Sequence, residues 1–302
     1  MHDLLILGSV NRDLIVHAPR LPEPGETLRG QSFASCIGGK GANQAVAAAR
    51  LGAKVALGAR VGLREGGAAL VAQLAREGVA THLIAQPEDE TPGVALIVVG
   101  AEDGENQIVT VAGSNGTLPV DQVEALPLAG VKYLVAQQEL PPASIARAFE
   151  RARAAGARTV LNAAPFRPEA VSLLPLVDLL VVNALEAAAL LPGEPATPEA
   201  LAQALRQRGP SSVLLSLGAE GLVWADAAGC QRHAARKVRA VDTVGAGDTL
   251  VGALITALAE GQAIEAALRF AQAAAAIAVS RPGVQDAMPT RAEVIQFLEA
   301  AP

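Results

Sequence analysis

Short β-branched runs alternate with alanine-rich helical segments along most of this chain. The apolar run Leu4–Leu7 predicts a first strand, and later strand and helix pairs repeat that order. This alternation is typical of a mostly parallel sheet covered by helices on both faces, so we expect an α/β fold of three α/β/α layers. The later strands are expected at 54–60, 133–136, 159–161, 179–182 and 213–216, and the helices at 42–51, 68–77, 143–155, 186–191, 246–259, 264–279 and 291–300.

Two stretches, at residues 12–36 and 91–113, interrupt this alternation. Each has two apolar runs around a polar turn, and the second turn contains Asp103 and Gly104. Such segments are typical of antiparallel hairpins. They predict either a small β-sheet that acts as a lid or simple additions to the edge of the main sheet. The runs expected to form the hairpin strands are 14–16 with 27–35, and 94–99 with 107–111.

Composition limits the class of protein. No linker or internal repeat divides the 302 residues, and 51% of them are apolar, so residues 1–302 are expected to form one domain with a large core. The net charge of −6 disfavours a general nucleic-acid binder, which needs a basic face. No apolar stretch is long enough for a signal peptide or a membrane span, so we expect no membrane contact and a cytoplasmic location. Cys36 and Cys230 are expected to be free thiols.

Residues 242–248 read DTVGAGD, and a helical pattern starts at once. Small residues let backbone N–H groups approach a ligand closely, and the first turn of a helix has unpaired N–H groups at the positive end of its dipole. Gly245, Ala246 and Gly247 therefore predict an anion site, with the Asp248 carboxylate beside it. This combination suits phosphoryl transfer, because one part holds charge and the other accepts a proton from a hydroxyl.

A second glycine-rich stretch, residues 38–45, reads GGKGANQA and also opens a helix. Lys40 and Asn43 supply donors suited to hydroxyls or phosphates. The stretch is not a Walker A loop, because the earlier glycine and the Ser/Thr after the lysine are missing. Alone it is either a structural turn or a ligand site, and the second anion-binding turn favours the ligand site.

Polar residues follow three of the expected strands. Asn11 and Asp13 follow the first strand. Asn183 and Glu186 follow the strand at 179–182, and the turn at 216–221 follows the strand at 213–216. Ligands of open α/β sheets bind at the carboxyl ends of the strands. An Asn and a carboxylate there could also orient Mg²⁺ through water. Each group has a plainer interpretation, as a turn, as a helix cap with a first-turn Glu, or as a connection.

These segments, in this order, resemble the ribokinase (PfkB) family of carbohydrate kinases over essentially the whole chain. The two strongest signatures are GGKGANQAVAAA at 38–49 and DTVGAGDT at 242–249. The resemblance implies a three-layer fold with a small β-sheet lid, and ATP-dependent phosphorylation of the 5-hydroxyl of D-ribose. The supporting segments are 8–13, 91–97, 104–108 and 273–279.

The resemblance also implies a role for individual residues. Asp248 would be the general base, and Gly245, Ala246 and Gly247 would form the anion hole, with Mg²⁺ on the nucleotide phosphates. The residues implied to contact the sugar are Asn11, Asp13, Gly39, Lys40, Asn43, Glu139 and Asp248. The residues implied to contact ATP are Asn183, Ser216, Leu217, Gly218, Ala219, Glu220, Gly221, Gly247 and Gln272.

Proteins of this family also use a monovalent cation, usually K⁺, and often form homodimers through the lid sheet. Asn183 and Glu186 would hold Mg²⁺ through water, although Ala184 and Leu185 stand between them where polar residues are common. The implied ligands of the monovalent cation are Asp242 and groups at Val244, Ala278, Arg281, Gly283 and Ala287. Of these, Ala287 stands where related chains can carry Ser.

Other functions stay open at this point. A kinase of the same family could act on a deoxyribose, a nucleoside, fructose or a ketodeoxy sugar acid. A nucleoside needs aromatic surface, and aromatic residues make up only 2% of the chain. A sugar acid needs an extra arginine near the sugar, a role open to Arg12. A sugar sensor without turnover would be expected to lose the base, whereas Asp248 is present.

Overall fold

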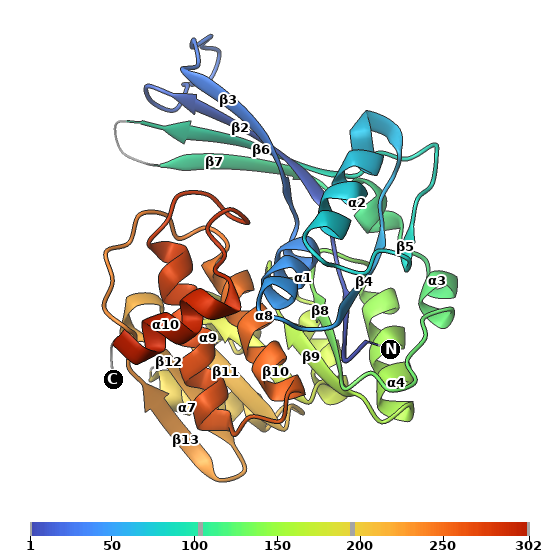
Figure 1. The fold of residues 1–302 in the computed structure, drawn as a ribbon, viewed down its shortest axis with the longest axis vertical. Coiled ribbons are helices and arrows are strands. Elements are labelled where there is room, and N and C mark those ends of the chain that lie inside the picture. Colours follow the sequence, from blue (N-terminus) through green and yellow to red (C-terminus); the bar gives the residue numbers. More distant parts are fainter. Residues whose placement is uncertain (1, 102–104, 194–196, 301–302) are drawn as a thin grey trace.

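The computed structural model describes residues 2–101, 105–193 and 197–300, and its body is a nine-stranded sheet (Figure 1). The strands are β1 (Leu4–Leu7), β4 (Val55–Arg60), β5 (Ile84–Ala85), β8 (Tyr133–Gln137), β9 (Arg158–Asn162), β10 (Leu179–Asn183), β11 (Ser212–Ser216), β12 (Leu222–Asp226) and β13 (Gly229–His233). Their order is β13-β12-β11-β10-β9-β8-β1-β4-β5. Only the β11–β12 and β12–β13 pairs are antiparallel, which confirms the expected mostly parallel sheet.

Two hydrophobic cores lie on opposite faces of this sheet. Leu4 and Ile6 of β1 belong to one core and Leu5 and Leu7 to the other, so the strand is buried on both faces. The expected three-layer α/β/α arrangement is therefore confirmed. The first core is covered by α1 (Lys40–Arg50), α2 (Gly67–Arg76), α8 (Ala246–Ala259), α9 (Ile264–Val279) and α10 (Arg291–Ala300), and the second by α3 (Val120–Glu124), α4 (Pro142–Ala154), α5 (Ala170–Leu173), α6 (Ala184–Leu190) and α7 (Pro198–Arg206).

A separate four-stranded sheet projects from the body (Figure 1). It consists of β2 (Asn11–Ala18), β3 (Ser32–Gly38), β6 (Gly93–Gly100) and β7 (Asn106–Val111), in the order β3-β2-β6-β7. Each expected hairpin is antiparallel, and the parallel β2–β6 pair joins the two. The expected strand at 27–35 starts too early, because the ladder with β2 begins only at Ser32, opposite His17, with the Gln31 N–H donating to the His17 carbonyl just before it. Asp103 and Gly104 of the second turn, the latter opening the family segment 104–108, lie outside the described residues.

The other differences are local. The short strand β5, the antiparallel strands β12 and β13, and the helices α3, α5 and α7 are not expected from the sequence, whereas α8, α9 and α10 have the expected bounds. In the described ranges, no helix combines the length and the apolar character needed to cross a membrane. Cys36 and Cys230 are free thiols, as expected.

The topology places the site. β1 lies between β4 and β8, so the chain builds the sheet outward in both directions from β1. Ligands bind at such a switch point, outside the carboxyl ends of the strands. The parallel strands β8, β9, β10 and β11 end at Gln137, Asn162, Asn183 and Ser216, so these four polar side chains share one edge of the sheet.

Candidate active site

The turn that precedes α8 presents unpaired backbone donors. Gly245 caps the helix in the left-handed conformation, with φ of 76°. The N–H of Ala246 donates a hydrogen bond to the Thr243 carbonyl at 3.3 Å. No hydrogen-bond acceptor in the described part of the chain faces the N–H groups of Gly247 and Asp248. The first turn of α8 therefore has donors available for an anion, next to the carboxylate of Asp248.

The Asp248 carboxylate is buried, with 6% of the residue exposed, and is held from the neighbouring helix α1. One oxygen accepts a hydrogen bond from Asn43 Nδ2 and the other from Gln44 Nε2, each at 3.0 Å. Burial raises the pKa of Asp248, while the nearby Lys40 ammonium and these two amides oppose that rise. Asp248 is thus a fixed carboxylate with a raised affinity for protons, as a general base requires.

Buried amides from two strand ends support Gln44. Gln137 Nε2 donates to Gln44 Oε1 at 2.7 Å, and Gln44 Nε2 also lies 3.0 Å from Asn162 Oδ1. The motifs in the sequence predict no role for Gln44, Gln137 or Asn162. Gln44 belongs to the glycine-rich GGKGANQA segment, and Gln137 and Asn162 are polar residues at the ends of adjacent parallel strands. The glycine-rich segment and the polar strand ends are the sequence features that point to these three residues.

Asn11 and Asp13 lie on one face of β2, because side chains alternate along a strand. Asn11 Oδ1 accepts from Asn115 Nδ2 at 2.8 Å, a partner that no motif in the sequence predicts. Asp13 Oδ1 is buried without a hydrogen-bond partner in the described part of the chain. Burial, and then the charge of Glu139, raises the pKa of Asp13 to about 6. A Cβ at Gly38 would overlap this carboxylate, so glycine is needed there.

Glu139 and Lys40 complete this part of the site. Glu139 Oε2 accepts from the Lys40 N–H at 3.0 Å and from the Ser9 hydroxyl. Gly39 has φ of 88°, and a Cβ there would lie 2.8 Å from the Asn11 nitrogen. The pKa of Lys40 is raised, chiefly by the Asp248 carboxylate and further by other acidic groups. This part of the site therefore contains both donors and acceptors, as a polyhydroxyl ligand requires.

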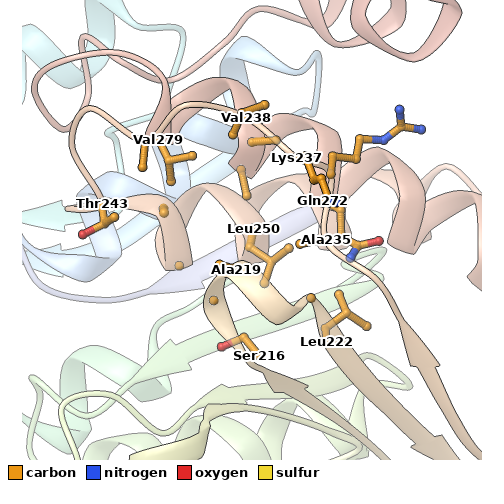
Figure 2. A pocket seen from close by; sticks show the side chains of 18 residues that line it. Ser216, Ala219, Leu222, Ala235, Lys237, Val238, Thr243, Leu250, Gln272 and Val279 are labelled. Carbon is orange, nitrogen blue, oxygen red and sulfur yellow. The ribbon is translucent and has the colours of Figure 1, made fainter. Parts of the chain in front are cut away.

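Two cavities meet at the turn before α8. A cavity of about 230 Å³ is lined by Lys40 and Asp248, and the larger one has a volume of about 610 Å³. The larger cavity is mainly apolar, and Figure 2 shows Leu250 between Ser216 and Leu222 on one side and Val238 and Val279 on the other. The lining residues common to both cavities are Ser216, Thr243, Gly247 and Leu250.

Most of the residues expected to contact ATP line these cavities. Gln272, Gly218, Ala219 and Gly221 line the larger one, and Gln272 Nε2 donates to the Ala234 carbonyl at 3.0 Å. Two members of the same turn are not among its lining residues. They are Leu217 and Glu220, of which Glu220 forms an ion pair with Arg232 at 2.5 Å.

Asn183 and Glu186 line the smaller cavity and also cap α6. Asn183 Oδ1 accepts from the Glu186 N–H at 2.8 Å, and Glu186 Oε2 accepts from the Asn183 N–H at 2.9 Å. The plainer interpretation as a helix cap is therefore correct, and a role with Mg²⁺ stays a prediction. Burial raises the pKa of Glu186. The described residues hold no group of three or more His, Cys, Asp or Glu side chains placed to bind a metal.

Asp242 joins the loop before α8 to the loop after α9. Its Oδ1 accepts from the Val244 N–H at 3.0 Å and its Oδ2 from the Gly283 N–H at 3.2 Å. The Ala278 carbonyl accepts from the Arg281 N–H at 3.1 Å, whereas the Arg281 side chain pairs with Glu293 at 2.6 Å. The nearby Ala287 is buried and offers only backbone oxygen. Carboxylate and carbonyl oxygens are ligands suited to a hard cation.

Comparisons with known proteins agree with this geometry. A model of the pfkB family of carbohydrate kinases matches residues 1–291. A ribokinase of Haemophilus influenzae is 40% identical over 99% of both chains, and one of Bacillus subtilis is 37% identical over 99% of this chain and all of the relative. The solved structure of an Arabidopsis thaliana ribokinase with ribose and ATP is 30% identical, with a TM-score of 0.91 over 99% of both chains. The chain belongs to the pfkB family of carbohydrate kinases.

Proposed function

We propose that this chain transfers the terminal phosphoryl group of ATP to the 5-hydroxyl of D-ribose. The observation that carries the proposal is the buried Asp248 carboxylate beside the free N–H groups of the α8 turn. Relatives named ribokinases, 40% and 37% identical over nearly their whole length, support ribose, and the solved relative with ribose and ATP supports both substrates.

In this mechanism Asp248 accepts the proton of the 5-hydroxyl while that oxygen forms a bond to the terminal phosphorus and the bond from phosphorus to ADP breaks. The backbone at Gly245–Gly247 stabilises the negative charge on the transferring group. Lys40 lines the same cavity and adds positive charge. Catalysis then consists mainly of positioning and of charge stabilisation.

The sugar would lie between β2 and the GGKGANQA segment. Each ribose hydroxyl donates one hydrogen bond and accepts others, so it matches the carboxylate and amide groups there. The unpartnered Asp13 Oδ1 is an acceptor that such a hydroxyl would satisfy. The residues proposed to hold ribose are Asn11, Asp13, Gly39, Lys40, Asn43, Glu139 and Asp248.

ATP would occupy the 610 Å³ cavity, with its phosphates toward Gly247. Mg²⁺ would supply positive charge to those phosphates, and Asn183 and Glu186 lie where they could hold it through water. A monovalent cation would be held by Asp242 and by oxygens of the Val244 and 278–287 backbone. The oxygen-rich donor set at Asp242 fits such a cation.

The geometry favours ribose over a sugar acid. Arg12 lies between Asn11 and Asp13 on β2, so its side chain leaves the opposite face of the strand. Its guanidinium donates to the Glu65 carbonyl instead. The arginine that a sugar-acid kinase would need is therefore turned away from the proposed sugar site.

We also propose that two copies of this chain pair through the small sheet. The register of its strands places Phe33, Leu96, Val109 and Val111 on the face opposite Asp13, and all four are exposed. A large exposed apolar patch marks an interaction site, and a second copy provides the matching face. A cytoplasmic location fits the free thiols and the need for ATP.

The test is Asp248→Asn with wild type in a coupled assay of ADP release across pentoses, hexoses, nucleosides and sugar acids. We expect ribose to be the best substrate of the wild type. The variant should lose about 10²–10⁴-fold in kcat while ribose binding by calorimetry persists. Asp89→Asn, at a side chain 95% exposed, is the matched control. Near-normal turnover in Asp248→Asn would show that Asp248 is not the general base. A substrate that the wild type turns over faster than ribose would overturn the choice of ribose.

A further inference from the structure

Asn43, which holds Asp248, is itself held by a buried amide with no role assigned so far. Gln285 Nε2 donates to Asn43 Oδ1 at 3.0 Å, and Asn43 Nδ2 donates to Asp248 at 3.0 Å. The exposed fractions are 6% for Gln285, 7% for Asn43 and 6% for Asp248. The three side chains form one buried line that joins the loop after α9, helix α1 and helix α8.

The direction of donation along this line follows from hydrogen-bonding capacity. An ionised carboxylate only accepts, so Asn43 must turn its Nδ2 toward Asp248. Its Oδ1 then faces Gln285, which must present its own NH₂ group. The Gln285 Oε1 is consequently left buried without a partner in the described ranges. An unpaired buried acceptor is unfavourable, so the bond that Gln285 Nε2 donates to Asn43 offsets a cost at the other end of the same amide.

The backbone at Gln285 is also fixed against α1. Arg50 donates to the Gln285 carbonyl and, at 3.0 Å, to the Met288 carbonyl. Arg50 in turn forms an ion pair with Glu77 at 2.7 Å. Arg50 lies seven residues after Asn43, two helical turns along the same side of α1. One side of α1 therefore holds both the backbone and the side chain of Gln285.

We infer that Gln285 is a positioning residue: its amide keeps Asn43 turned so that Asn43 donates to the ionised Asp248 carboxylate. Gln285 acts only through Asn43 and is not itself a catalytic residue. The role of the carboxylate as a base rests on the proposed function. The orientation of Asn43 by Gln285 does not, and it can be measured without turnover.

The test replaces Gln285 by methionine, which keeps the length of the side chain and removes the donor. Asn43 then loses its fixed orientation and donates less well to Asp248. We expect the pKa of Asp248 to rise, since that hydrogen bond lowers it in the wild type. The acidic limb of the pH profile of kcat with ribose should move up by about one pH unit, so kcat on that limb should fall roughly tenfold, with the KM for ATP unchanged.

A second readout uses the chain labelled with ¹³C at its aspartate carboxyl carbons. The Asp248 resonance, assigned by its loss in Asp248→Asn, should titrate at higher pH in Gln285→Met than in the wild type. Gln285→Glu is the second variant, because an ionised carboxylate cannot donate to Asn43. It should shift the resonance in the same direction. An unshifted Asp248 titration in the folded variants overturns the inference.

Gln122→Met is the matched control. Gln122 also donates from Nε2, to the Ala59 carbonyl at 2.7 Å, and its Oε1 is also buried without a partner in the described part of the chain. It should change thermal stability but not the titration of Asp248. In an Asn43→Ala background, Gln285→Met should have no further effect, whereas additive effects would contradict a role through Asn43.

The two proposals fail in different ways. If Asp248→Asn keeps its turnover while Gln285→Met shifts the Asp248 resonance, the assignment of the base is wrong and the inference on Gln285 stands. If Asp248→Asn is inactive and the resonance does not move, the proposed function stands and Gln285 has no positioning role.

Discussion

Asp13→Asn should stabilise the fold at pH 8 and at the same time weaken the binding of ribose. Asp13 carries a carboxylate that the fold keeps in an unfavourable setting. One oxygen is buried without a partner in the described ranges, and burial together with Glu139 raises the pKa to about 6. Folding at neutral pH must therefore place an ionised group where its protonated form is preferred.

The size of this effect follows from the change in pKa. The pKa of Asp13 rises from an ordinary 3.8 to about 6 on folding. At one pKa unit per 1.36 kcal/mol, this is about 3 kcal/mol. Between these two values the folded state binds more protons than the unfolded state. The free energy of unfolding therefore falls as the pH rises from about 4 to about 6, and it stays at the lower level above pH 6.

Asparagine carries no charge at any of these pH values, so the contribution of residue 13 to the pH dependence of the free energy of unfolding disappears. The variant should be more stable than wild type by up to about 3 kcal/mol at pH 8, with the difference shrinking to about half of that at pH 5. Urea unfolding at pH 5, 6, 7 and 8 measures this. Asp89→Asn, at an exposed side chain, should leave the wild-type pH dependence intact.

The decisive quantity is how the difference in free energy of unfolding between wild type and Asp13→Asn changes with pH. Parallel stability curves for wild type and Asp13→Asn from pH 5 to 8 would refute the reasoning, whatever their vertical offset. The same variant should raise the KM for ribose by roughly 10- to 100-fold, because it weakens a hydrogen bond from a hydroxyl to a charged acceptor. The KM for ATP should not change, since Asp13 does not line the nucleotide cavity.

Three further predictions concern the glycine beside Asp13, the proposed cation site and the exposed face of the small sheet. Gly38→Ala should raise the KM for ribose at least tenfold with the KM for ATP unchanged, because its Cβ would overlap the Asp13 carboxylate; unaltered steady-state kinetics would contradict this. Wild-type activity should be higher in K⁺ than in Na⁺, and Asp242→Ala should abolish that difference. Equal wild-type rates in both salts would refute the assignment of a monovalent cation site at Asp242. Phe33→Asp, at a residue 66% exposed, should convert a dimer to a monomer in sedimentation velocity, whereas a wild-type chain that is already monomeric would end the dimer proposal.

The parts of the fold that the sequence predicts well are those whose pattern is local. β1 is a continuous apolar run because both of its faces are buried, and α8, α9 and α10 are long segments with matching bounds. The sequence does not predict the hairpin of β12 and β13, because an alternation of strands and helices gives no reason to expect antiparallel pairing. It predicts too early a start for β3, because that start depends on where pairing with β2 begins.

The same distinction applies to the site. Glycine-rich turns and polar strand ends can be found by spacing, and they include Asn11, Asp13 and Asp248. The supporting amides cannot be found this way, because their meaning depends on contacts between distant segments. Gln137 reaches Gln44 across 93 residues, and Gln285 reaches Asn43 across 242. An amide at a strand end or in a loop has many possible partners, and only the folded chain selects one.

Asp13 and Asp248 differ in one respect that separates their proposed roles. The protein itself supplies two amide donors to Asp248, which oppose the effect of burial on its ionised form before any ligand arrives. A base needs this, because it must be ready to accept a proton when the hydroxyl is in place. No described residue donates to Asp13 Oδ1, so a hydroxyl of the proposed sugar would find this acceptor free. Substitutions at Asp13 should therefore appear mainly in the KM for ribose, and substitutions at Asp248 mainly in kcat.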